Sequence, residues 1–123
     1  MNPILLIDDH PITNYINRKI LQINGITNPI TDFTNPVEAL QVVKEKEKLI
    51  IFLDLNMPQM TGWQFLEILE NGERNHKIVI VSSSTWEEDK LRALEHSNVV
   101  AYLTKPLNHK KINTLLKSLK LNT

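Results

Sequence analysis

Four short apolar runs, each followed at once by polar residues, constrain the fold of this chain more than any other feature of its sequence. They occupy residues 4–7, 49–53, 78–81 and 99–104. Runs of this length with no alternation of polar and apolar residues are typical of strands that are buried on both faces. They therefore predict a parallel sheet that is covered by helices on both sides.

The polar residues at the ends of these runs all have side chains that can bind a metal or a phosphate. They are Asp8 and Asp9, Asp54, Ser82 and Ser83, and Lys105. All carboxyl ends of a parallel sheet lie on one edge, and open α/β sheets bind ligands outside that edge. We therefore expect these carboxylates, hydroxyls and the ammonium to converge on one site.

Segments with helical spacing separate the apolar runs. They predict helices at about residues 11–23, 36–46, 62–69, 85–96 and 108–119, with a weaker strand at 30–33. Some of these helices carry spaced apolar residues, which are Ile12, Ile16, Ile20 and Ile23 in the first, Leu91 and Leu94 in the fourth, and Ile112, Leu115, Leu116 and Leu119 in the fifth. Such rows are expected to face the sheet.

The alternation of strands and helices predicts one α/β domain over residues 1–123. The fold class expected at this length is a flavodoxin-like, doubly wound, five-stranded parallel sheet of order 2-1-3-4-5 with five helices. In this order the first and third strands are neighbours. Asp8, Asp9 and Asp54 are therefore expected to lie close together.

Composition excludes several classes of function. The chain has 14 basic and 14 acidic residues and no cysteine, so it has no disulfide framework, no thiol chemistry and no global charge that favours nucleic acid. No apolar stretch approaches the roughly 20 residues that span a bilayer. We expect a cytoplasmic protein that binds neither nucleic acid nor membrane.

The expected cluster permits phosphoryl chemistry. Packed carboxylates raise one another's pKa unless a cation is present, and oxygen ligands favour Mg²⁺, Ca²⁺ or Mn²⁺. A third carboxylate beside such an ion, here Asp54, can act as a nucleophile and form an aspartyl-phosphate. Lys105 and either Ser82 or Ser83 would neutralise the charge on the phosphoryl oxygens.

Taken together and in order, these pieces resemble the receiver domain of the two-component response-regulator family, over nearly the whole chain. The resemblance is carried by Ile7-Asp8-Asp9, the segment 53–62 around Asp54, Val81-Ser82-Ser83 and Lys105-Pro106. Each piece alone is common in proteins. Their order, their spacing and their position after apolar runs make the combination specific.

The resemblance implies a role for each matching residue. Asp54 corresponds to the phosphoacceptor, which receives its phosphoryl group from a sensor histidine kinase or a histidine phosphotransfer protein. Asp8 and Asp9, with Asp54 itself and the backbone carbonyl of Asn56, correspond to the residues that hold Mg²⁺, with Mn²⁺ as an alternative. These roles predict a signalling switch and no turnover enzyme.

Three further positions are implied by the same resemblance. Lys105 corresponds to the lysine that pairs with the acceptor carboxylate, and its bond to Pro106 is expected to be cis. Ser82 corresponds to the switch hydroxyl, although counting back from Lys105 favours Ser83 and leaves that choice open. Tyr102 corresponds to the aromatic switch residue, which moves between exposed and buried positions.

The resemblance also implies how the signal leaves the domain. We expect a stand-alone, chemotaxis-type receiver without an output domain, which as a monomer or weak dimer signals through contact with an unknown downstream protein. The four histidines, at 10, 76, 96 and 109, lack the spacing of a metal site and are expected at the surface. His10, which is nearest the site, is expected at most to modulate it.

Three other functions compete with this one. An aspartyl-phosphate hydrolase of the haloacid dehalogenase type needs a second aspartate where Asn56 stands. A flavodoxin-like cofactor binder needs a phosphate loop after the first strand, where Asp8 and Asp9 would repel phosphate. A receiver without phosphorylation would be expected to lack one of the acidic residues or Lys105.

Overall fold

A computed structural model describes residues 2–70 and 75–119. Its elements, in chain order, are β1 (Ile4–Ile7), α1 (Pro11–Ile23), β2 (Ile30–Phe33), α2 (Pro36–Glu45), β3 (Ile50–Asp54), α3 (Gly62–Glu70), β4 (Lys77–Ser82), α4 (Glu87–Leu94), β5 (Val99–Thr104) and α5 (His109–Leu119). The five strands form one parallel sheet in the order β2-β1-β3-β4-β5. The predicted fold class and strand order are confirmed.

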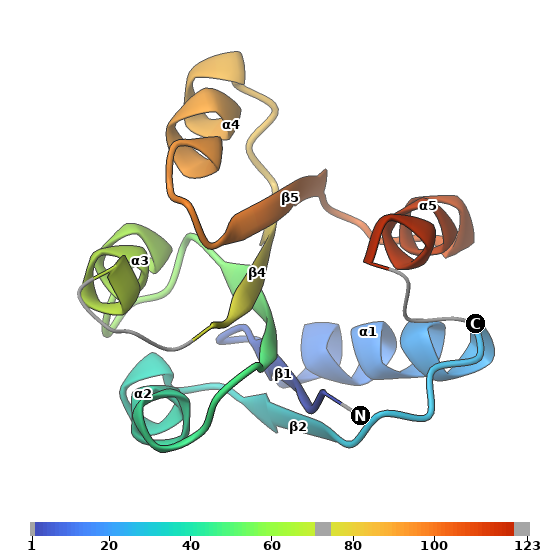
Figure 1. Cartoon of the computed structure of the whole chain (residues 1–123). Helices are drawn as coiled ribbons and strands as arrows, with labels where there is room; N and C mark the ends of the chain where they lie inside the picture. The colour runs from blue at the N-terminus through green and yellow to red at the C-terminus, as the bar shows by residue number, and fades with distance from the viewer. Residues whose placement is uncertain (1, 71–74, 120–123) are drawn as a thin grey trace.

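The sheet is the middle of three layers (Figure 1), with α1 and α5 on one side and α2, α3 and α4 on the other. Alternate strand residues serve the two faces because successive side chains in a strand point in opposite directions. In β1, Leu5 and Ile7 pack toward α2 and α3, whereas Ile4 and Leu6 pack toward α1 and α5. This double burial explains why the central strands are uninterrupted apolar runs.

The fifth helix matches its sequence pattern, because all four residues of its predicted stripe are buried against the sheet. Asn35 caps the start of the second helix, as expected: its Oδ1 accepts a hydrogen bond of 2.9 Å from the Val37 amide. The fourth helix is shorter than predicted, because Trp86 has an extended backbone and caps α4 at its start. Thr85 therefore lies in the preceding loop.

The expectation for the apolar row of α1 holds for Ile20, which is partly buried against the core, but is wrong for the other three isoleucines. Ile12, Ile16 and Ile23 are 74%, 48% and 69% exposed, whereas Asn14 and Asn17 are buried on the face toward the sheet. The reason lies outside the helix: Asn14 Nδ2 donates to the backbone carbonyls of Asp8 and Phe33, each at 3.1 Å. Tertiary hydrogen bonds thus orient α1 against the preference of its isoleucines.

The fourth helix also differs from its prediction. Leu91 and Leu94 are 56% and 42% exposed, and Ala93 is the one residue of α4 that is buried. A small residue at the contact lets α4 lie against the sheet while its larger apolar side chains remain in solvent. Within residues 2–70 and 75–119, no helix is long and apolar enough to cross a membrane.

The sequence predicted a surface position for His76, and this prediction is wrong. The residue is 4% exposed and lies beside the amino end of β4. Its Nδ1 accepts a 3.0 Å hydrogen bond from the Leu49 amide, and its Nε2 lies 3.0 Å from the Val43 carbonyl oxygen. This arrangement requires the neutral ring with its proton on Nε2. The histidine thus joins the end of α2 to the starts of β3 and β4.

Candidate functional site

The residues from three different strand ends meet at the carboxyl edge of the sheet. Asp8 follows β1, Asp54 ends β3, and Lys105 follows β5. Lys105 Nζ lies 2.7 Å from Asp8 Oδ2 and 3.4 Å from Asp54 Oδ1. Both carboxylates are buried, at 4% and 3% exposure, so one ammonium holds two desolvated acids.

The electrostatics of Asp54 are unfavourable to its charge. Burial raises the pKa of Asp54 above its ordinary value, and the neighbouring Asp8 carboxylate raises it further. Lys105 and the Asn56 amide, which donates to Asp54 Oδ1 at 3.3 Å, only partly offset this effect. A carboxylate in such surroundings gains from any additional positive charge.

The surroundings of Lys105, unlike those of Asp54, favour the charged form of the side chain. Its burial favours the neutral amine, but the hydrogen bond to Asp8 and the charges of Asp54 and Asp8 outweigh that effect and leave the Lys105 pKa raised. The side chain therefore remains an ammonium throughout the neutral pH range. Its bond to Pro106 is cis, as expected.

The acidic pair lies beside His10 in the turn between β1 and α1. One ligand atom from each of Asp8, Asp9 and His10 lies within 4.8 Å of the other two. Asp9 Oδ1 is buried, and no hydrogen-bond partner for it exists among the described residues. An unsatisfied carboxylate oxygen beside a second carboxylate suits a hard divalent cation, so the donor set fits Mg²⁺ or Mn²⁺.

The end of β4 separates the two candidate switch hydroxyls. Ser82 is the last residue of β4, is fully buried, and pairs in register with Thr104 of β5. Its Oγ accepts a 3.1 Å hydrogen bond from the Ser84 amide. Ser83 is exposed. Ser82 is therefore the buried one of the two candidate serines.

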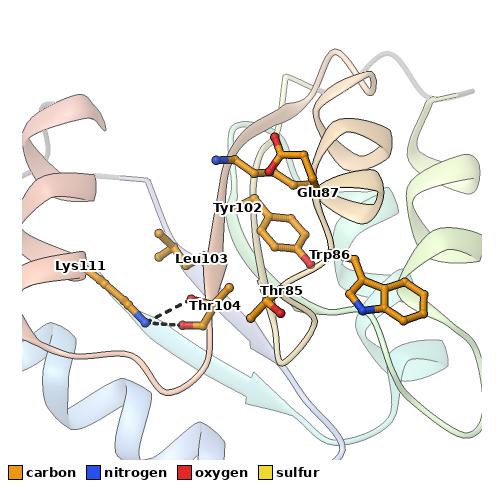
Figure 2. A pocket seen from close by; sticks show the side chains of 8 residues that line it. Thr85, Trp86, Glu87, Tyr102, Leu103, Thr104 and Lys111 are labelled. Carbon is orange, nitrogen blue, oxygen red and sulfur yellow. Dashed lines mark hydrogen bonds between the residues drawn. The ribbon is translucent and has the colours of Figure 1, made fainter.

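Tyr102 is half-buried and is linked to the same loop. Its hydroxyl donates a 3.0 Å hydrogen bond to the Ser84 carbonyl oxygen. Figure 2 shows its ring beside a pocket that Trp86 and Lys111 also line. Ser84 therefore connects Ser82 of β4 to Tyr102 of β5 through two direct hydrogen bonds.

The loop after β3 fixes the position of Asp54. Asn56 is exposed, and its amide faces Asp54 as described above. Gly62, the first residue of α3, donates its amide to the Leu55 carbonyl oxygen at 2.9 Å. A Cβ at Gly62 would lie 2.7 Å from the Asp54 carbonyl oxygen, so only glycine permits this close approach.

Two residues that support the site were missed in the sequence. Asn14 bonds the ends of β1 and β2, as described above. Lys111 Nζ donates to the Thr104 and Pro106 carbonyl oxygens at 2.7 and 3.0 Å, on either side of Lys105 (Figure 2 shows the contact with Thr104). For Asn14, the available signal was its position off the row of isoleucines in α1. For Lys111, the sequence offers no signal, because lysines are common on helix surfaces.

Comparison with known proteins agrees with this geometry. The family model for the response regulator receiver domain matches residues 4–117. The transcriptional regulatory protein BtsR of Salmonella typhi is 29% identical over 120 residues, which are 98% of this chain and 48% of that protein. The chain spans about half the length of the curated relatives it matches.

Solved structures share the fold. A two-component response regulator from Cytophaga hutchinsonii has a TM-score of 0.86 and 26% identity, with coverage of 98% of this chain and 97% of that one. The response regulator TrrA from Thermotoga maritima, in complex with Mg²⁺-BeF, has a TM-score of 0.80 and 23% identity, with coverage of 97% and 99%.

Proposed function

The chain belongs to the response regulator receiver family, whose members are signalling phosphoacceptors rather than turnover enzymes, and we propose that Asp54 is its phosphoacceptor. The observation that carries this proposal is the contact of one lysine, Lys105, with both Asp54 and Asp8 at the carboxyl edge. Asp54 is the member of this group that stands at the centre of the sheet, on β3. Its carboxylate attacks phosphorus, and the donor's histidine leaves.

Asp8 and Asp9 are proposed to hold Mg²⁺, or Mn²⁺, together with Asp54 and the backbone carbonyl of Asn56. The unsatisfied Asp9 Oδ1 and the raised pKa of Asp54 support this assignment, because both gain from a nearby cation. When bound, the ion neutralises charge on the phosphoryl oxygens. The complex of TrrA with Mg²⁺-BeF is a parallel in another receiver.

Lys105 and Ser82 are proposed to bind the phosphoryl group on Asp54. The ammonium of Lys105 already lies 3.4 Å from Asp54 Oδ1, and Ser82 is favoured over Ser83 because its side chain is the buried one. A Ser82 hydroxyl that turns to the phosphoryl group gives up its bond from the Ser84 amide. The hydrogen bond of Tyr102 to Ser84 then carries the change to the surface of β5.

The partners of this domain are proposed from its family. The phosphoryl donor is a sensor histidine kinase or a histidine phosphotransfer protein, as for receiver domains in general. The signal passes to a downstream protein through direct contact with the single receiver domain formed by residues 1–123, which acts as a monomer or weak dimer. The cytoplasm, where such donors present their phosphohistidine, is the proposed location.

Phosphorylation can be tested directly on the purified chain. Incubation with acetyl phosphate and Mg²⁺ should add one phosphoryl group in the intact mass, and Asp54→Asn should remove this adduct because the nucleophile is lost. Asp32→Asn is the matched control. Asp32 lies on β2, at the opposite edge of the sheet from β5, and pairs with Arg18 of α1. An adduct that survives Asp54→Asn, or none in the unaltered chain, would overturn the proposal.

A further inference from the structure

The ring of His10 lies against both members of the acidic pair. Its Nδ1 is 3.2 Å from Asp8 Oδ1 and 3.1 Å from Asp9 Oδ1. The His10 amide also donates to Asp8 Oδ1 at 2.9 Å, which fixes the backbone that carries the ring. A nitrogen that can bind a metal therefore stands at near-equal distances from two carboxylate oxygens.

These separations match the ligand spacing around an octahedral ion. Ligands at about 2.1 Å from such an ion lie about 3.0 Å apart when they are neighbours. The contact between Nδ1 and Asp9 Oδ1 has the distance of a hydrogen bond, but Asp9 Oδ1 has no hydrogen-bond partner among the described residues. Nδ1 is also within hydrogen-bond distance of Asp8 Oδ1, so an ion bound between these three atoms would take the place of their direct contacts.

We propose that His10 is a ligand of the ion held by Asp8 and Asp9, and that it widens the site from Mg²⁺ to first-row transition ions. This inference rests on the proposed function, in which the acidic pair holds a divalent cation. Carboxylates and water suit Mg²⁺, whereas imidazole nitrogen suits the later ions of the first transition series. A set of two oxygens and one nitrogen therefore favours Co²⁺ over Mg²⁺ more strongly than oxygens alone.

The location of His10 allows such a role. Its side chain is 68% exposed, whereas that of Asp8 is 6% exposed, so His10 is the solvent-accessible member of this group. Lys105 occupies the other oxygen of Asp8, Oδ2. That contact leaves Asp8 Oδ1, together with Asp9 Oδ1 and His10 Nδ1, for the ion.

The test is to titrate Mg²⁺ and Co²⁺ into the full chain by calorimetry, with His10→Ala beside the unaltered protein. Loss of the nitrogen ligand should weaken Co²⁺ binding by about tenfold or more and leave Mg²⁺ binding within about threefold. His109→Ala is the matched control, because His109 is an exposed histidine that contacts Asn24 at the far end of α1. It should change neither affinity.

A spectroscopic measurement identifies the ligand itself. Pulsed electron paramagnetic resonance of the Mn²⁺-loaded chain should show coupling to a nitrogen nucleus, and His10→Ala should abolish it. If His10→Ala changes both affinities equally, or changes neither, His10 is only a neighbour of the carboxylates and the inference is wrong. If neither ion binds the unaltered chain, the proposed cation site at Asp8 and Asp9 fails with it.

Discussion

The two edges of the sheet treat buried polar groups in opposite ways. At the amino edge, both ring nitrogens of His76 lie within hydrogen-bond distance of the backbone, which joins three elements. At the carboxyl edge, Asp54 and Asp8 are buried as charges that repel each other and share one ammonium. Uncharged groups with hydrogen-bond partners stabilise a fold, whereas buried charges of like sign that shift a pKa mark candidates for chemistry. The comparison therefore separates structural from functional polar residues in this chain.

The largest effect on stability is expected at the amino edge. His76→Ala should lower the free energy of unfolding by about 3 kcal/mol, because it leaves the Leu49 amide and the Val43 carbonyl buried without this partner and opens a cavity. Urea denaturation measures the change, and the exposed His109→Ala is its control. If His76→Ala lowers the free energy of unfolding no more than His109→Ala does, His76 is not a structural residue.

Gly62→Ala should have the next largest effect, this time at the carboxyl edge. The new methyl group would meet the Asp54 carbonyl and the Leu55 Cα at 2.7 Å, and backbone atoms move only at a cost of about 1–3 kcal/mol. We expect slower phosphorylation as well, because the backbone of Asp54 must shift. Thermal unfolding with a phosphorylation time course checks both; an unchanged rate would show that the acceptor tolerates displacement.

Lys111→Met should act mainly on function. The change removes three hydrogen bonds to Thr104 and Pro106, so the turn that carries Lys105 loosens while stability falls by only about 1 kcal/mol. Phosphorylation by a small donor should slow several-fold. The exposed neighbour Lys110→Met serves as the control. Equal rates for the two variants would show that Lys105 needs no such support.

The last prediction concerns the stability of Asp54→Asn, whose change has the opposite sign to that of the other three variants. Because the folded state raises the pKa of Asp54, its ionisation destabilises the fold as pH rises through that pKa. Asparagine removes this penalty and should stabilise the chain at neutral pH by about 1 kcal/mol. The difference should shrink as pH falls toward and below the ordinary value of 3.8. Destabilisation at neutral pH would place Asp54 with the structural residues.

Most of the fold was predictable because its signals are local. The buried runs of β1, β3 and β4 and the stripe of α5 each lie within a few consecutive residues, and the strand order is the one expected for a flavodoxin-like fold of this length. The meeting of Asp8, Asp54 and Lys105 was predictable for the same reason, since each ends a strand. The family resemblance, confirmed by the matching model, rests on these residues.

Orientation was less predictable, because it depends on distant partners. The isoleucines of α1 predicted the wrong buried face, and the burial of His76 has no signal in its neighbours along the chain. Hydrogen bonds across 19 residues for Asn14 and 27 for His76 decide both outcomes. Periodicity shows that a helix has an apolar row but not that the row faces inward.

The sequence by itself determined the central strands and the residues at the carboxyl edge, because burial on two faces and strand ends are properties of consecutive residues. Tertiary structure alone decided which side chains point into that edge. The strand β4 ends at Ser82, which is buried, and Ser83 is exposed in the loop that follows. The turn after β1 likewise brings His10 to Asp8 and Asp9, through contacts that spacing in the sequence does not specify.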